Sequence, residues 1–419
     1  MKRLTRRHIE IERLLYSSNG PPTFTTSLSW RSSPSTILPP SHQARFLNPR
    51  RCASTTASAR PKTALFFPGQ GVQRVGMATP WLTSFPTTCR PFLEELDHIL
   101  HYPLSRIISD GPNSTLTATE NAQPAIMATS VMVLRVLEQE FGFQTSERID
   151  VCLGHSLGEF AALVSSEHLQ YADALKMVRR RAEVMARLSR EASNDSNGAE
   201  YGMVALVCEP NHLPSLVETI HDFLAHDAEG TRDDSSSKRP IEQVSIGNIN
   251  SSNQIVLSGN IERIKILLVQ LRQFGGHDPR AVRLSTDSPF HSPLMAEAVT
   301  AMREMLARTE VRFPGPFPCV SNVSARPFES EADLKDLLSR ECVETVRWWD
   351  SIRFLHQEWG VKRWVGLGPG KVGRNLVGKE VGMEGREAGK GAGVWAITHP
   401  KEVEECLRGL EKTDAVDQE

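Results

Sequence analysis

The 419-residue chain has no long hydrophobic run, no paired cysteine motif and little basic character over most of its length. No stretch approaches the roughly 18 apolar residues that a membrane-spanning helix needs, so the sequence predicts no membrane span. Its seven cysteines are odd in number and widely scattered, and they include no Cys-x-x-Cys pair. This usage is typical of a reducing compartment and supports neither a disulfide framework nor a zinc site.

The basic residues gather at one end of the chain. Residues 1–60 contain ten Lys and Arg residues but only two acids, Glu10 and Glu12, which leaves 38 basic and 48 acidic residues beyond them. The formal charge of the larger part is therefore near −10. This balance argues against nucleic acid as a partner, because a nucleic-acid-binding surface needs a basic face.

The first sixty residues have the composition of an organellar targeting segment. They are rich in Arg, Ser, Thr and Pro, and they lack the apolar core of a secretory signal. We expect a transit peptide over 1–60 and a location in the mitochondrial matrix. A plastid-targeting segment and a disordered basic tail are the alternatives that this composition leaves open.

Short apolar runs alternate with helical patterns along the rest of the chain. The runs indicate buried strands at 64–67, 149–153, 318–320, 363–367 and 394–397. Strands that alternate with helices favour a mostly parallel sheet covered by helices on both faces. The sequence therefore predicts an α/β fold with its core in residues 61–199 and 287–405.

Residues 200–286 follow a different pattern, in the order strand, helix, strand, strand, helix, strand. The expected strands are 203–207, 243–249, 254–257 and 281–284, and the expected helices are 213–224 and 261–274. This βαββαβ order is that of the ferredoxin-like fold, so we predict a small subdomain inserted into the core. The polar stretch 226–240 is expected to be a disordered insertion, and residues 406–419 a C-terminal tail.

The pentapeptide Gly154-His155-Ser156-Leu157-Gly158 has the Gly-x-Ser-x-Gly form of a nucleophile elbow. A predicted strand precedes it and a predicted helix follows it, which is the setting typical of a hydrolase-like α/β core. The tight turn presents the serine hydroxyl at a helix N-terminus, where backbone amides favour developing negative charge. Ser156 is therefore the predicted nucleophile, and its neighbour His155 is expected to point elsewhere.

Five motifs in this order carry a resemblance to a known family. They read FPGQGVQ at 67–73, NAQPA at 121–125, GHSLGE at 154–159, SPFHS at 288–292 and GPGKV at 368–372. Together they resemble malonyl-CoA:acyl-carrier-protein transacylases and the acyltransferase domains of fatty acid and polyketide synthases. The resemblance covers roughly residues 63 to 405, and the targeting segment brings the chain nearest to the mitochondrial type II enzymes.

The resemblance implies a catalytic dyad of Ser156 and His291. In the family the histidine is the general base and is oriented by a backbone carbonyl, so Asp287 is not assigned as a third member. The amide of Leu157, which follows the nucleophile, is expected to stabilise the oxyanion. The resemblance assigns the second oxyanion-hole amide to Gln70.

Arg181 is the residue that bears most directly on the substrate. Leu175, Val178, Ala182 and Met185 form an apolar helical stripe, and Arg181 falls within it. A buried arginine needs an anionic partner, although a structural acid or a snorkelling side chain would also explain the pattern. The resemblance aligns Arg181 with the family's arginine that grips the free carboxylate of malonyl through a bidentate fork.

Further positions are assigned to substrate binding through the resemblance. Phe290 corresponds to a bulky residue of malonyl-selective members and should crowd a methyl branch on the substrate. The polar residues expected to line the site are Gln123, Asn248, Asn250 and His155. One departure from the family lies at 344–348, where this chain reads ETVRW and bacterial relatives carry Gln at the fourth position of the run.

These expectations give a serine acyltransferase that moves malonyl from malonyl-CoA to phosphopantetheinylated acyl carrier protein in ping-pong fashion. No metal or redox cofactor is expected, and the protein is expected to act as a monomer. A stand-alone acyltransferase of a polyketide synthase shares every predicted catalytic residue and remains an alternative. A serine esterase or thioesterase is a second alternative, against which the buried Arg181 argues.

Overall fold

The computed structural model describes residues 60–415 except 197, 230–242, 287 and 383–392. Residues 1–59 of the predicted transit segment and Asp287 lie outside the described residues. Residues 230–240 of the predicted insertion lie outside them as well.

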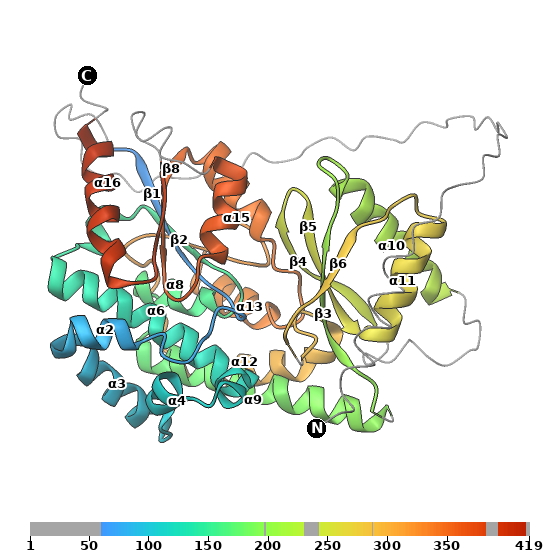
Figure 1. The fold of residues 1–419 in the computed structure, drawn as a ribbon, viewed down its shortest axis with the longest axis horizontal. Coiled ribbons are helices and arrows are strands. Elements are labelled where there is room, and N and C mark those ends of the chain that lie inside the picture. Colours follow the sequence, from blue (N-terminus) through green and yellow to red (C-terminus); the bar gives the residue numbers. More distant parts are fainter. Residues whose placement is uncertain (1–59, 197, 230–242, 287, 383–392, 416–419) are drawn as a thin grey trace, which may run out of the picture. The chain divides into compact units, whose positions relative to one another are not determined.

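The first of two sheets is entirely parallel, with strand order β7-β2-β1-β8-β9 (Figure 1). Its strands are β1 (Lys62–Phe67), β2 (Val151–Gly154), β7 (Cys319–Val320), β8 (Val361–Leu367) and β9 (Gly393–Ile397). Because all five strands run the same way, their carboxyl ends lie along one edge. The loops that follow β1, β2 and β7 therefore meet at that edge.

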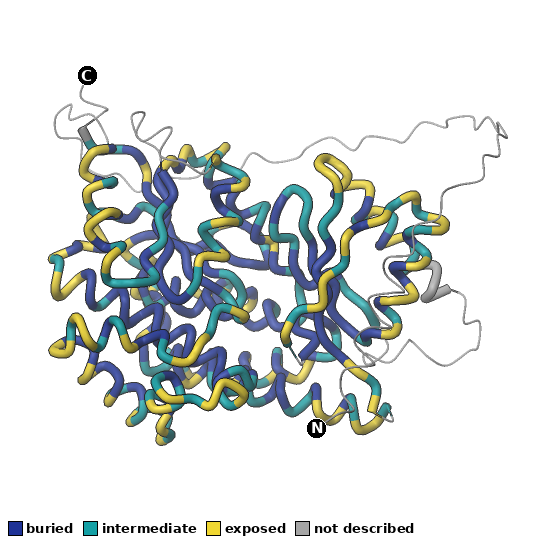
Figure 2. Tube along the Cα trace, in the orientation of Figure 1, coloured by how far each residue is buried: buried dark blue, intermediate teal, exposed yellow. Residues whose placement is uncertain are grey.

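Alternate residues of β1 face two separate hydrophobic cores, as a strand buried on both faces requires. Leu65 and Phe67 belong to the larger core, and Ala64 and Phe66 to the smaller one. Helices α6 (Thr119–Phe141), α8 (Gly158–Ser165) and α9 (Tyr171–Asp195) contribute to the larger core, and α14 (Trp348–Arg353) and α15 (Val372–Val381) to the smaller. Burial is nearly continuous along these strands, whereas the helices keep exposed outer faces (Figure 2).

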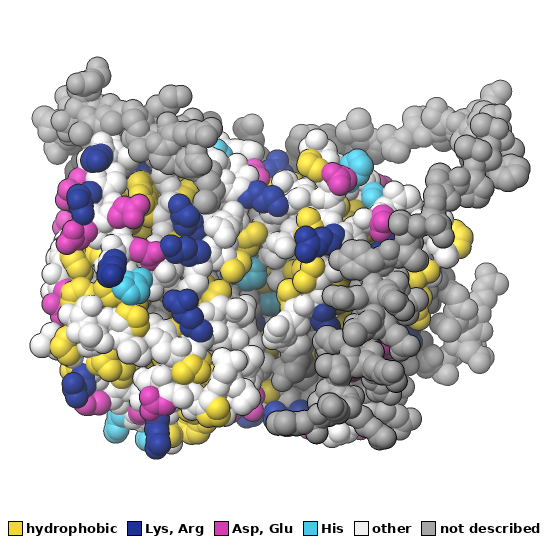
Figure 3. Space-filling view, in the orientation of Figure 1, with side chains coloured by type: hydrophobic (Ala, Val, Ile, Leu, Met, Phe, Trp, Pro, Cys, Tyr) yellow, Lys and Arg dark blue, Asp and Glu magenta, His cyan; other side chains and the backbone are white. Residues whose placement is uncertain are grey.

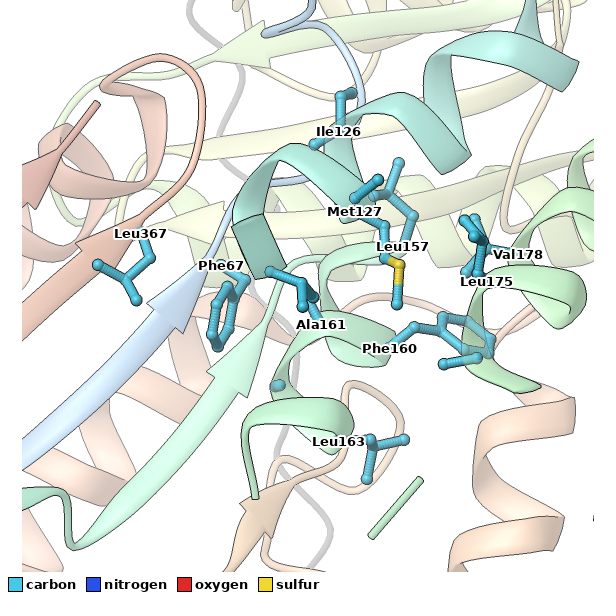
Figure 4. Packing of buried hydrophobic residues seen from close by; sticks show 14 of the residues in the cluster. Phe67, Ile126, Met127, Leu157, Phe160, Ala161, Leu163, Leu175, Val178 and Leu367 are labelled. Atoms are coloured by element: carbon cyan, nitrogen blue, oxygen red, sulfur yellow. The ribbon is translucent and has the colours of Figure 1, made fainter. Parts of the chain in front are cut away.

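Helix α8 fills the space between the sheet and the other helices of the larger core. Its residues Phe160, Ala161 and Leu163 are fully buried. In Figure 4, Ala161 lies near Phe67 of β1, while Phe160 lies on the side of α8 that faces α9. The residues immediately after β2 are thus fixed by packing on both sides.

The second sheet is antiparallel, in the order β4-β5-β3-β6. Its elements are β3 (Tyr201–Val207), α10 (Leu213–Glu229), β4 (Val244–Ser251), β5 (Gln254–Asn260), α11 (Ile261–Gln273) and β6 (Arg280–Arg283). Val204 and Leu206 of β3 pack against α10 and α11, whereas Met203 and Ala205 on the opposite face join the larger core. The predicted parallel sheet flanked by helices and the predicted βαββαβ subdomain are both confirmed.

Two boundary predictions are wrong. The insertion was expected to begin at 226, but α10 continues to Glu229. The tail was expected from 406, but helix α16 spans Val403–Ala415. The many charged residues of this segment made its apolar stripe hard to recognise in the sequence, although Val403, Cys406 and Leu410 of that stripe are buried.

The remaining helices complete the helical layers around the parallel sheet. They are α2 (Thr79–Ser84), α3 (Pro86–Leu100), α4 (Leu104–Asp110), α5 (Asn113–Thr117), α7 (Thr145–Arg148), α12 (Ala296–Arg308) and α13 (Glu331–Arg340), with short turns at Pro293–Met295, Phe354–Glu358 and Pro400–Glu402. None of the helices in the described part of the chain has the length and apolarity needed to cross a membrane. Basic and acidic side chains are interspersed on the face shown in Figure 3, which carries no continuous basic field.

Candidate active site

Ser156 lies in the turn between β2 and α8, in the left-handed backbone conformation with φ 51°. This conformation is uncommon outside glycine and is held by the close packing of the turn. A Cβ atom at Gly154 would lie 2.0 Å from the carbonyl carbon of Gly158, and one at Gly158 would lie 2.6 Å from the carbonyl oxygen of Pro68. Both glycines are therefore required by the geometry of the elbow.

Asn322, two residues beyond the end of β7, stabilises this turn. Its Oδ1 accepts a hydrogen bond from the Ser156 amide at 3.0 Å, and its Nδ2 donates to the Gly154 carbonyl at 2.8 Å and to Glu159 Oε2 at 2.6 Å. Burial raises the pKa of the Glu159 carboxyl well above its ordinary value. Sequence patterns did not single out Asn322. The only signal was a polar residue two positions after a strand, at the carboxyl edge of the sheet.

His291 lies beside the nucleophile, as the resemblance to the family implies. Its Nε2 lies 2.9 Å from Ser156 Oγ, and its Nδ1 lies 2.8 Å from the backbone carbonyl oxygen of Glu341. Because a carbonyl can only accept, Nδ1 must carry the proton, which leaves Nε2 as an acceptor for the serine hydroxyl. Burial lowers the pKa of His291 to about 4. The imidazole is consequently neutral near pH 7, which is the state that a general base needs.

The antiparallel sheet holds His291 in place. Ser245 Oγ of β4 donates to the His291 carbonyl at 3.0 Å, and Ser258 Oγ of β5 donates to the carbonyl of Phe290. His291 is itself in the left-handed region, with φ 57°. Two neighbouring strands thus fix a strained loop that carries the base to a nucleophile on the other sheet.

Two backbone amides near the nucleophile are unpaired. Neither the Gln70 nor the Leu157 N–H has a hydrogen-bond partner among the residues that the structure describes. Gln70 follows β1 and Leu157 follows Ser156, so both belong to loops at the same sheet edge. Unpaired amides in this position are suited to stabilise an oxyanion.

Arg181 of α9 is buried, as its position on the apolar stripe predicts, and only 1% of its surface is exposed, whereas Arg180 is exposed. Its Nη2 donates to Ser156 Oγ at 3.2 Å, and its Nη1 donates to Gln123 Oε1 at 2.7 Å. Nη2 also lies 2.8 Å from Glu341 Oε2. The anionic partner that a buried arginine needs is therefore present in the structure itself.

Glu341 is a second residue that the sequence patterns did not single out. Like Arg181, it is 1% exposed, and its Oε1 lies 3.8 Å from His291 Nε2. Burial pushes the pKa of the Glu341 carboxyl upward, but the Arg181 charge opposes this and holds it below its ordinary value. A signal was present, since Leu337, Leu338 and Glu341 share the spacing of one helical face, an acid among apolar neighbours.

The other predicted substrate-binding residues surround the dyad. Gln123 on α6 is 1% exposed and donates from Nε2 to Gln70 Oε1 at 3.4 Å. Asn250 Oδ1 on β4 lies 2.9 Å from His155 Nε2, so His155 points away from Ser156 as predicted. Asn248, also on β4, has a buried Oδ1 without a hydrogen-bond partner among the described residues.

A cavity of about 580 Å³ opens at Ser156 and His291. Its walls come from the β1 loop, from Phe290 and from the face of the antiparallel sheet opposite α10 and α11, including Met203 and Val256. Asn248, Asn250 and His155 also line it, whereas Arg181 lies behind the serine. The volume falls within the usual range of small-molecule sites, roughly 300–1,000 Å³.

The departure at 344–348 does not reach the imidazole. His291 is held by the carbonyl of Glu341, three residues before that run. Thr345 Oγ1 donates to the Ile246 carbonyl, and Arg347 Nε pairs with Asp350 at 2.9 Å. The change therefore leaves the contact between the base and its backbone acceptor intact.

Within the described residues, no group of three or more His, Cys, Asp or Glu side chains could hold a metal ion.

Known proteins resemble this chain in sequence and in structure. Residues 65–222 match the acyl transferase domain family. The malonyl CoA-acyl carrier protein transacylase of Bacillus subtilis (strain 168) is 34% identical over 318 residues, which cover 76% of this chain and 90% of that protein. The acyl-carrier-protein-S-malonyltransferase of Bartonella henselae is 29% identical with a TM-score of 0.69, covering 84% of this chain and 99% of the other.

A third relative was solved with its partner. It is a malonyl-transacylase in complex with a holo type II polyketide synthase acyl-carrier protein, 26% identical to this chain with a TM-score of 0.68, covering 83% of this chain and 99% of the other. These likenesses extend over most of the chain and confirm the predicted hydrolase-like α/β fold class. The chain belongs to the malonyl CoA-acyl carrier protein transacylase family, whose members are acyltransferases.

Proposed function

We propose that this protein transfers the malonyl group of malonyl-CoA to the phosphopantetheine thiol of an acyl carrier protein through a malonyl-serine intermediate. The observation that carries the proposal is a buried guanidinium beside an activated serine, with Arg181 Nη2 3.2 Å from Ser156 Oγ. A guanidinium fork binds a carboxylate in bidentate fashion, and malonyl carries a carboxylate near its thioester. The names of the relatives support the same substrate pair.

In the first half-reaction, His291 Nε2 takes the proton of Ser156 Oγ as that oxygen attacks the thioester carbonyl. The oxyanion that forms is stabilised by the amides of Gln70 and Leu157. The carbon–sulfur bond then breaks, and the imidazolium returns its proton to the departing coenzyme A thiolate. Ser156 is left as the malonyl ester.

The second half-reaction uses the same groups in reverse. The carrier-protein thiol gives its proton to His291 Nε2 and attacks the malonyl-serine carbonyl, and Ser156 Oγ leaves with that proton. Asn248 and Phe290 line the approach to the ester. Phe290, next to the base, supports discrimination against an acyl group with a methyl branch.

All the proposed catalytic groups come from one chain, which supports action as a monomer. The Arg-, Ser-, Thr- and Pro-rich composition of residues 1–60 supports a role in fatty acid synthesis in the mitochondrial matrix. A fluorescent fusion of the full chain, compared with one that lacks residues 1–60, tests the location. Cytosolic signal from both fusions would refute the matrix assignment.

Intact mass spectrometry tests the activity. The wild-type protein mixed with malonyl-CoA should gain the mass of one malonyl group and lose it when phosphopantetheinylated acyl carrier protein is added, which gains the same mass. Ser156→Ala should gain nothing. An adduct on Ser156→Ala would remove Ser156 as the nucleophile, and release of the group as free malonate without transfer would identify a thioesterase instead.

A further inference from the structure

The carboxylate of Glu341 pairs with the same nitrogen of the Arg181 guanidinium that contacts the nucleophile. Arg181 Nη2 lies 2.8 Å from Glu341 Oε2 and 3.2 Å from Oε1, and the same nitrogen lies 3.2 Å from Ser156 Oγ. An acyl group esterified to Ser156 with a carboxylate of its own would therefore meet a guanidinium nitrogen that already has an anionic partner. Nη1 is held by Gln123.

The charges of the site cancel before substrate arrives. Arg181 is cationic, Glu341 is anionic because its pKa lies below the ordinary carboxyl value, and His291 is neutral. A substrate carboxylate thus adds negative charge to a buried site of no net charge, where like charges are poorly screened. An uncharged acyl group meets no such opposition.

We propose that Glu341 is a specificity-determining residue, which competes with the substrate carboxylate for Arg181 and so weakens the preference for malonyl over uncharged acyl groups such as acetyl. The inference rests on the proposed malonyl transfer. The apparent affinity for malonyl falls in proportion to the fraction of molecules in which the guanidinium is free of Glu341. Acetyl binding does not depend on that fraction.

A purely structural ion pair would not need to reach the nucleophile. The chain offers one for comparison, because Arg363 is also 1% exposed and pairs with Asp414, and neither residue lines the cavity. Glu341, by contrast, pairs with the guanidinium nitrogen that also contacts Ser156 Oγ.

The test compares wild type with Glu341→Gln, which removes the charge, keeps the shape and leaves the backbone carbonyl that orients His291. The readout is kcat/KM for malonyl-CoA and for acetyl-CoA with acyl carrier protein as acceptor. The malonyl-to-acetyl ratio of these values should rise by about tenfold or more in Glu341→Gln, chiefly through a lower KM for malonyl-CoA. An unchanged or lower ratio would overturn the inference, because a structural role would lower both activities together.

Two further variants keep the test decisive. Glu341→Asp retains the charge but withdraws the carboxylate by one methylene group, so the ratio should rise by less than in Glu341→Gln, and it serves if the latter does not fold. Asp414→Asn removes the carboxylate partner of Arg363 and should leave the malonyl-to-acetyl ratio of kcat/KM unchanged. A ratio raised as much as in Glu341→Gln would refute the specific role of Glu341. Failure of the wild type to form a malonyl adduct would count against the proposed function, whereas an adduct with an unchanged ratio counts only against this inference.

Discussion

Replacing Asn322 by alanine should destabilise the protein and slow the acylation of Ser156, because Asn322 holds the turn that carries this serine. The substitution removes three side-chain hydrogen bonds, to the Ser156 amide, the Gly154 carbonyl and Glu159. A buried polar group that loses its partner costs about 1–3 kcal/mol. Glu159 still accepts from the backbone amide of residue 322. The loss therefore comes from the Ser156 amide and the Gly154 carbonyl, and it amounts to roughly 2–6 kcal/mol of unfolding free energy. Water entering the vacated space would bring the loss toward the lower end.

The effect on chemistry follows from the backbone of Ser156. A non-glycine residue held at φ 51° stores strain of about 1–3 kcal/mol. Without the hydrogen bond from the Ser156 amide to Asn322, the elbow can relax to a conformation that is lower in energy by about this strain. At equilibrium only about one molecule in 5 to one in 150 would then remain in the reactive conformation. The rate of malonyl-enzyme formation should fall by the same factor.

Rapid-quench mixing with malonyl-CoA followed by intact mass measurement gives this rate directly, and chemical denaturation gives the stability. Asn260→Ala is a suitable control, because Asn260 caps helix α11 and accepts from the Arg263 amide away from the elbow. Its loss should cost about 1 kcal/mol of stability without slowing acylation. Acylation by folded Asn322→Ala within twofold of the wild-type rate would refute this account of the elbow.

Two other predictions concern the charges of the site. Arg181→Lys retains one positive charge but loses the planar guanidinium fork. The value of kcat/KM for malonyl-CoA should fall by about 10- to 150-fold, which corresponds to one charged hydrogen bond of about 1.5–3 kcal/mol, while the value for acetyl-CoA should fall much less. Equal losses for both substrates would contradict a carboxylate-binding role. Because burial lowers the pKa of His291 from 6.5 to about 4, the acid limb of malonyl-enzyme formation should fall near pH 4 rather than near 6.5. The same shift means that the unfolded chain binds the proton more tightly, so the stability due to neutral His291 is complete above about pH 6.5 and declines as the pH falls toward 4. Acylation rates between pH 4.5 and 8, with circular dichroism at each pH to verify folding, check the first statement, and half-loss near pH 6.5 in folded protein would contradict it. Chemical denaturation at the same pH values checks the second, and a stability that does not decline below pH 6.5 would contradict it.

Local patterns were sufficient to predict the elbow, the helix that carries Arg181 and the order of elements in the inserted subdomain. The elbow could be predicted because Gly154, Ser156 and Gly158 lie within five residues and their roles depend on backbone geometry alone. Arg181 could be placed because burial on a helix follows a short period. In each case the determining contacts lie within a few residues of one another in the sequence.

Contacts between distant segments could not be predicted in this way. Asn322 reaches Ser156 across 166 positions, and Glu341 reaches Arg181 across 160. These pairings depend on the order of the strands in the sheet, in which β1 pairs with β8 from near the other end of the chain. Local patterns in a single sequence do not predict that order. The base His291 was placed only through resemblance to a family, because nothing in its own neighbourhood marks it as catalytic.

The hold of the antiparallel sheet on His291 makes chemical reactivity depend on the completeness of folding. Nucleophile and base belong to different sheets, and Ser245 and Ser258 fix the loop that brings the imidazole across. A molecule whose antiparallel sheet has opened retains its serine on the elbow but has no base beside it. Such a molecule lacks the base that acylation of Ser156 needs, so uptake of an acyl group requires both sheets to be in place.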